Sequence, residues 1–95
     1  MQQEVNIPKL RYPLSKYSSR YLLETYERVC LFRAVWCQSQ WEWEHGTPVF
    51  NYCRRQVDDA NKFLADLSEF LVIKRDFDLG YLINLEVRCI EDVNA

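Results

Sequence analysis

The side chains best suited to chemistry are a single histidine and two pairs of closely spaced carboxylates. His45 lies in a predicted turn directly after Glu42 and Glu44, and Asp76 and Asp78 occupy a second predicted turn. Carboxylate pairs and histidine can serve as general acids and bases near neutral pH. No nucleophile or further base accompanies them, and the chain contains no HExxH, GxSxG, P-loop or GxGxxG motif. We therefore expect a protein that is not an enzyme.

Four cysteines are the next candidates, because thiolates bind metals. Together with His45, three of them could supply four ligands to Zn²⁺, but the spacing matches no zinc finger and no CxxC pair is present. Thiols that fall on the apolar stripe of a helix usually pack in the core. We expect neither a metal nor another cofactor, and we assign a packing role to Cys30, Cys37, Cys53 and Cys89.

Large aromatic side chains form the richest group, with six Tyr, five Phe and three Trp among 95 residues. Trp, Tyr and Arg are enriched at the energetic centres of protein interfaces. Aromatic rings beside arginines can also stack nucleic-acid bases, and rings of this size can simply fill the core of a short chain. The interface interpretation predicts a partner-binding set made of Tyr17, Arg20, Tyr21, Arg28, Leu31, Arg33, Val35, Trp36, Trp41 and Trp43.

A first helix over about 16–43 must carry most of this set. Its apolar residues recur at helical spacing, and Ser15, Ser18 or Ser19 could cap its start. Leu31 and Val35 fall on the otherwise polar side, so the middle of this helix is apolar nearly all round. Such a helix is either the central element of the fold or part of an interface. Arg33 lies within the apolar stripe and needs a carboxylate or carbonyl partner.

A second helix over about 48–71 follows a clear boundary. Gly46 suits the end of the first helix, Thr47 suits an N-cap, and Pro48 suits the first helical position. The apolar face of this helix includes Val49 and Tyr52, and charged residues occupy the opposite face. The two helices are expected to form a long helical hairpin.

The C-terminal region supports two interpretations. Apolar and polar residues alternate from position 81 to 89, which favours a short β-hairpin over about 71–89, with a turn around Gly80. The alternative is a third helix with Leu82, Leu85, Cys89 and Val93 on one face. In either case we expect a mainly α fold in which residues 1–95 form a single domain and residues 1–14 form an extended N-terminal arm.

Charge and hydropathy limit the partners. The net charge is −2, with an excess of bases in residues 1–40 and of acids in residues 41–95. A chain that is acidic overall is a poor general binder of nucleic acid. The sequence shows no signal peptide and no apolar run long enough to span a bilayer. We expect an intracellular protein that is not secreted, does not associate with membranes and binds another protein.

Several short segments resemble one family, the sixth subunit of eukaryotic and archaeal RNA polymerases, which is related to bacterial ω. Ser15–Lys16–Tyr17 is similar to that family's S/T-K-Y start of the first helix, and residues 42–48 resemble its acidic turn before a proline. Residues 71–75, followed by Asp78, Gly80 and Tyr81, resemble its V-I-R-R strand and its D-G-x-Y hairpin. The resemblance implies a non-catalytic polymerase subunit that clamps the largest subunit and aids assembly.

These observations favour a small non-catalytic protein that acts by protein–protein binding, for example as an accessory or assembly subunit of a larger complex such as an RNA polymerase. One alternative is a viral or phage-type inhibitor that occupies the surface of a host protein. Another is a self-associating helical protein whose first helix packs against its own copy.

Overall fold

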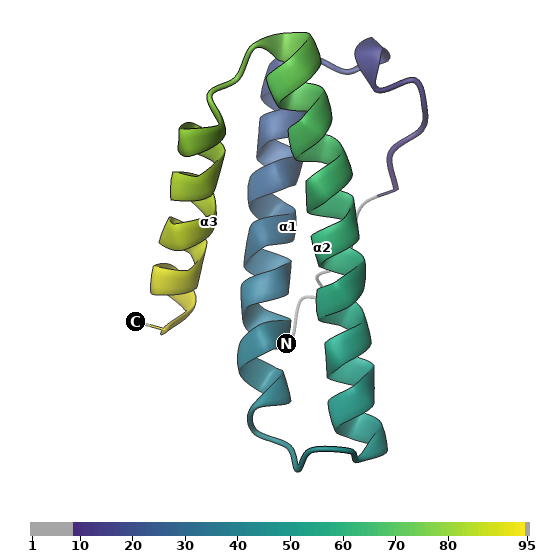
Figure 1. Cartoon of the computed structure of the whole chain (residues 1–95), viewed down its shortest axis with the longest axis vertical. Coiled ribbons are helices and arrows are strands. Elements are labelled where there is room, and N and C mark those ends of the chain that lie inside the picture. The colour runs from purple at the N-terminus through teal and green to yellow at the C-terminus, as the bar shows by residue number, and fades with distance from the viewer. Residues whose placement is uncertain (1–8, 95) are drawn as a thin grey trace.

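Three α-helices dominate the computed structural model, which describes residues 9–94 (Figure 1). A short 3₁₀ turn, η1 (Leu14–Lys16), precedes α1 (Ser19–Gln40), α2 (Pro48–Arg75) and α3 (Leu79–Asn94). No strand occurs between residues 9 and 94. The mainly α class and the long hairpin of α1 and α2 are therefore confirmed.

α1 begins and ends inside the predicted range of 16–43. The Ser18 side chain caps its start by accepting a hydrogen bond from the Tyr21 backbone N–H at 3.1 Å. At the other end, the backbone N–H groups of Trp41, Glu42 and Trp43 each donate to the carbonyl three residues earlier. This tightening of the last turn ends the helix at Gln40 and leaves both tryptophans in the connecting turn, where we had predicted helix.

The boundary before α2 matches its predicted residues. Thr47 caps the helix by accepting a hydrogen bond from Phe50 N at 3.3 Å, and Pro48 occupies its first turn. Gly46 has a φ of 88°, a left-handed conformation that suits glycine, although it lies in the turn and not directly at the end of α1. α2 continues one turn beyond the predicted end at 71 and stops at Asp76, whose backbone is left-handed with a φ of 55°.

The β-hairpin expected over 71–89 is wrong, and the alternative of a third helix is confirmed. Residues 81–89 alternate in polarity, but the same segment places Leu82, Leu85 and Cys89 on one helical face, and these three are buried. Ile83 and Val87, which a strand would have turned inward with Leu85, stay exposed. The V-I-R-R and D-G-x-Y segments of the polymerase resemblance are accordingly helical or at a helix start.

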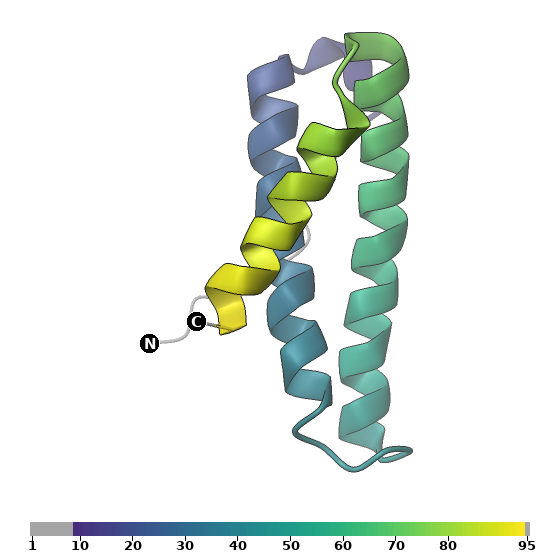
Figure 2. The same ribbon diagram turned by 60° about the vertical axis from the view of Figure 1, so that its left-hand side comes forward.

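The core is built around α1, which packs against α2 on one side and α3 on the other (Figure 2). α2 and α3 touch each other little, so α1 is the central element of the fold, one of the two alternatives that its apolar circumference left open. The buried apolar side chains of this core are Leu14, Leu22, Tyr26, Val29, Cys30, Phe32, Ala60, Leu64, Leu67, Leu71, Leu82, Leu85 and Cys89.

The N-terminal arm is joined to the end of α2 by one arginine. The Arg75 guanidinium donates to Ser19 Oγ at 2.7 Å, to the Tyr17 carbonyl at 2.7 Å and to the Ser15 carbonyl at 3.2 Å. Residues 9–13 are non-helical, as expected, but η1 already begins at Leu14. The rest of the arm predicted over 1–14, residues 1–8, lies outside the described residues.

Candidate interaction surface

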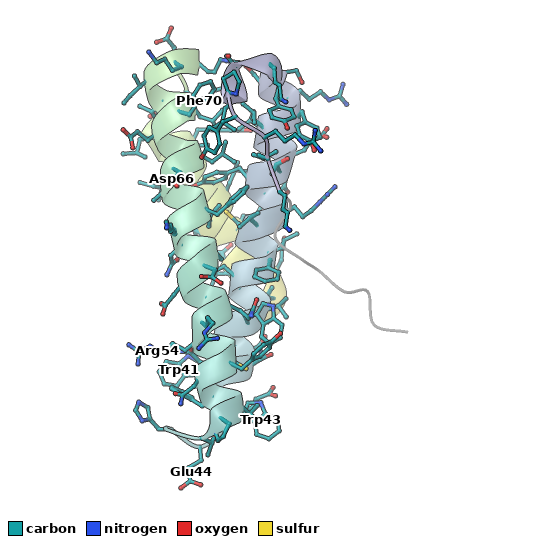
Figure 3. All side chains as sticks on the ribbon, turned by 90° about the vertical axis from the view of Figure 1, so that its right-hand side faces the viewer. Trp41, Trp43, Glu44, Arg54, Asp66 and Phe70 are labelled. Atoms are coloured by element: carbon teal, nitrogen blue, oxygen red, sulfur yellow. The ribbon has the colours of Figure 1, made fainter. Side chains whose placement is uncertain are left out.

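The side chains that could act as acids and bases do not form a site. Asp78 Oδ1 accepts the Gly80 N–H at 2.9 Å and so caps α3, and Asp76 ends α2. His45 is exposed in the α1–α2 turn, where its ring contacts Phe50 with centroids 4.6 Å apart. Glu44 points away from the body of the protein in the same turn (Figure 3). The two aspartates thus have structural roles, and Glu42 and Glu44 in the α1–α2 turn are exposed to solvent.

The cysteines are free thiols, and three of the four are buried. Burial raises the pKa of the Cys30 thiol to about 12, and burial also raises the pKa of Cys89. Such thiols stay protonated and unreactive at neutral pH. Within residues 9–94, no group of three or more His, Cys, Asp or Glu side chains is arranged to hold a metal ion.

Arg33 has the carboxylate partner that its place in the apolar stripe required. Its Nη2 lies 3.5 Å from Glu86 Oε1 on α3, and its Nη1 donates to Asn61 Oδ1 on α2 at 3.0 Å. The Tyr26 hydroxyl also donates to Glu86 Oε1, at 2.9 Å. This polar network links all three helices. Arg33 is therefore half-buried and held by contacts within the fold.

Trp36 was expected at an interface, but it is partly buried in the hairpin. It packs against the core, beside Phe32 at 6.1 Å between centroids and edge-on to Tyr52 at 5.6 Å. Tyr17 also packs against the core, and its hydroxyl accepts the Arg11 N–H at 2.9 Å. These two aromatic side chains mainly hold the fold together.

The remaining candidates lie in two places on the surface. Trp41 and Trp43 sit in the α1–α2 turn and are 73% and 50% exposed. Val49 and Tyr52, which were predicted on the inner face of α2, are also exposed beside this turn. We call the α1–α2 turn that carries Trp41 and Trp43 the tryptophan turn; Figure 3 shows its two tryptophans on opposite sides of the hairpin end.

The second place is the outer face of α1. Tyr21, Leu31 and Val35 are 45%, 37% and 48% exposed there, and Arg20 and Arg28 are exposed as well. The predicted set is therefore not one surface. It divides into an interior group, a turn and a helix face.

Val49 and Tyr52 were missed as surface residues because both fall within the apolar arc of α2. α3 and the described part of the arm both stop short of this end of the hairpin (Figure 1). The sequence does not reveal this, because it depends on how the helices are arranged in space.

A hollow of about 870 Å³ lies between the arm and the second half of α2. Tyr12 and Leu14 line it from the arm side, and Phe70 and Ile73 line it from α2. The charged side chains at its rim are of both signs, Asp66 and Glu69 against Lys74 and Arg75. Their balance favours no particular class of ligand.

Comparison with known protein families, curated proteins and solved structures finds no match to this chain. No helix within residues 9–94 has both the length and the apolar character needed to cross a bilayer.

Proposed function

We propose that this chain is a small non-catalytic protein that binds another protein through the tryptophan turn. The observation that carries the proposal is the exposure of Trp41 and Trp43 at the end of a two-helix hairpin. Tryptophan is the residue type most enriched at interface hot spots, where its large apolar ring is removed from water. The two rings lie on opposite sides of this turn, so they offer a partner two separate apolar contacts.

The hairpin supports this turn from both sides. Thr47 caps α2 directly after it, and the edge-on contact between Trp36 and Tyr52 joins α1 to α2 beside it. A turn fixed in this way loses little conformational entropy when it binds. Neither tryptophan belongs to the buried core, so a partner can still bury the exposed half or more of each ring.

Quantitative affinity purification of the tagged full chain from its native cells tests the proposal. The double variant Trp41→Ala/Trp43→Ala should lose the partners that the unchanged protein retains. The matched control is Tyr81→Ala, which removes an exposed ring from the first turn of α3 at the other end of the molecule. The proposal fails if the double variant captures the same proteins at the same level as the control.

An accessory or assembly subunit of an RNA polymerase is one specific form of this function. Residues 42–48, which resemble the acidic turn of the sixth-subunit family, form part of the α1–α2 turn. In this form the large polymerase subunits must be among the captured proteins, and the double variant must release them. If the protein captures other proteins but no polymerase subunit, the result supports the binding function and contradicts the polymerase-subunit proposal.

A further inference from the structure

The face of α1 that points away from the core carries a regular stripe of exposed residues. Tyr21, Glu24, Arg28, Leu31 and Val35 follow one another at alternating spacings of three and four residues, and all five are exposed. We call them the outer stripe. This spacing keeps residues on one side of a helix and is the spacing at which two helices pack in a coiled coil.

The outer stripe differs from an ordinary solvated helix face because both of its ends are apolar. Leu31 and Val35 form an aliphatic end. Tyr21 forms an aromatic end, where its ring stacks on Tyr17 with centroids 5.3 Å apart. Glu24 and Arg28, of opposite charge, lie between the two ends. α2 and α3 pack on other sides of α1, so neither covers the stripe.

The order of these residues favours a second copy of the same chain in one orientation. In a parallel pair, Glu24 would meet Glu24 and Arg28 would meet Arg28. In an antiparallel pair with its two-fold axis midway between these two residues, each Glu24 faces the Arg28 of the second copy. The same axis places Tyr21 beside Leu31 of the second copy, so that an aromatic ring covers an aliphatic side chain. Charge and shape are then both complementary.

We propose that the protein forms an antiparallel homodimer through the outer stripe of α1. A single pair of helices buries an area at the low end for protein interfaces, so the dimer is weak and forms in the micromolar range. The Arg20–Glu24 ion pair does not prevent this. Both of its side chains are largely exposed, at an Nε–Oε1 distance of 3.3 Å, and such pairs contribute little to stability.

One charge acts against the dimer and thereby makes the geometry testable. Glu27 is exposed on the flank of the stripe close to the proposed axis, so each Glu27 approaches the Glu27 of the second copy. The repulsion is small because both carboxylates are in water. The arrangement leaves the two tryptophan turns at opposite ends of the dimer, and the proposal is independent of the binding function assigned to them.

Sedimentation equilibrium of the full chain under reducing conditions, over a range of concentrations, tests the dimer. Leu31→Glu should raise the dissociation constant at least tenfold, and Glu24→Arg or Arg28→Glu should each weaken association severalfold. The double reversal Glu24→Arg/Arg28→Glu should restore association, because position 24 of each copy again faces an opposite charge at position 28 of the other copy. Glu27→Gln should tighten the dimer. All of these positions are exposed, so each variant should fold, and circular dichroism checks this.

The matched control is Ile83→Glu, which places the same carboxylate on an exposed apolar residue of α3 and should leave the dimer unchanged. A protein that is monomeric at all concentrations overturns the proposal. A dimer that tolerates Leu31→Glu, or that is lost with Ile83→Glu, also overturns it, because another face then forms the contact. Failure of the double reversal to restore association overturns the antiparallel arrangement. The Trp41→Ala/Trp43→Ala variant should dimerise normally.

Discussion

The two ends of the helical hairpin are built on different principles. At one end, Arg75 joins α2 to the arm and to the start of α1, and Asp78 caps α3. At the other end, Trp41 and Trp43 stand in water, and Gln40 Oε1 is buried without a hydrogen-bond partner within residues 9–94. The arm end also exposes apolar side chains, among them Tyr12, Leu79 and Tyr81, but hydrogen bonds fix its loop carbonyls and the start of α3. The turn end differs from the arm end in the Gln40 oxygen, unpaired among the described residues, and in the two tryptophan rings that it exposes.

Helix length accounts for the difference. At 1.5 Å per residue, α3 is about 24 Å long and α2 about 42 Å. α3 starts near the C-terminal end of α2 and crosses α1, but ends well before the turn (Figure 2). The third helix therefore buries one part of the hairpin and leaves the rest as two helices. Substitutions of buried residues in α3 should therefore lower stability, whereas substitutions in the turn should leave stability nearly unchanged and weaken binding.

The largest effect on stability is expected from Leu82→Ala. Leu82 is fully buried between α3 and the hairpin, and removing a buried leucine side chain costs about 2–5 kcal/mol of unfolding free energy. Ile83→Ala is the matched control, since Ile83 is exposed on the same helix and should cost less than about 1 kcal/mol. Urea unfolding followed by circular dichroism measures both. A larger loss for Ile83→Ala than for Leu82→Ala would mean that the segment is a strand.

The next effect is a loss of stability at alkaline pH. Burial raises the pKa of Cys30 from 9.0 to about 12 and raises the pKa of Cys89 and of Tyr26, whose hydroxyl also donates to Glu86. The native protein then holds these protons more tightly than the unfolded chain does. The contribution of Cys30 is fully present below about pH 9 and falls toward pH 12, by up to about 1.4 kcal/mol per pH unit, and Cys89 and Tyr26 act in the same direction.

Urea unfolding with a reductant present, at several pH values between about 7 and 10, measures this slope. Cys30→Ala removes one thiol whose pKa burial raises, so the variant should be less stable at neutral pH but should lose less stability as the pH rises. An equal slope in the variant and the unchanged protein would show that Cys30 does not contribute.

A smaller effect is expected from Tyr26→Phe, which removes one donor from the network that joins the helices. Glu86 then keeps Arg33 but loses the hydroxyl at 2.9 Å, and a hydrogen bond to a charged group contributes about 1–2 kcal/mol. Tyr21→Phe, at an exposed ring of the same helix, should change stability by less than about 0.5 kcal/mol. Equal effects in thermal or urea unfolding would show that the network contributes nothing beyond the aromatic rings.

Local signals in the sequence were sufficient to predict the hairpin. Ser18, Thr47, Pro48 and Gly46 act within one turn of their own positions, so their roles follow from residue type alone. The sequence also required a partner for Arg33, but it could not name Glu86, because that contact joins residues far apart in the chain. The choice between strand and helix for residues 81–89 depended on the same kind of distant contact, with α1.

The candidate surface was harder to predict than the fold. An apolar arc on a helix shows which residues can be buried, but the neighbouring elements decide which of them are. Tyr52 and Trp36 have similar positions in their helical patterns, yet Tyr52 is exposed and Trp36 is partly buried against it. Leu31 and Val35, which broke the pattern of their own helix, were predicted at a surface together with Tyr21, Trp41 and Trp43, and all five are exposed.

The smallest effect on stability should come from the tryptophan turn itself. Trp41→Ala and Trp43→Ala remove rings that are largely in water, so each should change the unfolding free energy by less than about 0.5 kcal/mol. Trp36→Ala removes a ring of the same type that packs on Phe32 and Tyr52, and it should cost about 1–3 kcal/mol. Urea unfolding of the three variants in parallel measures the contrast. If Trp41 or Trp43 proved as costly to remove as Trp36, these rings would be structural, and the absence of a folding role would no longer distinguish the turn end from the rest of the hairpin.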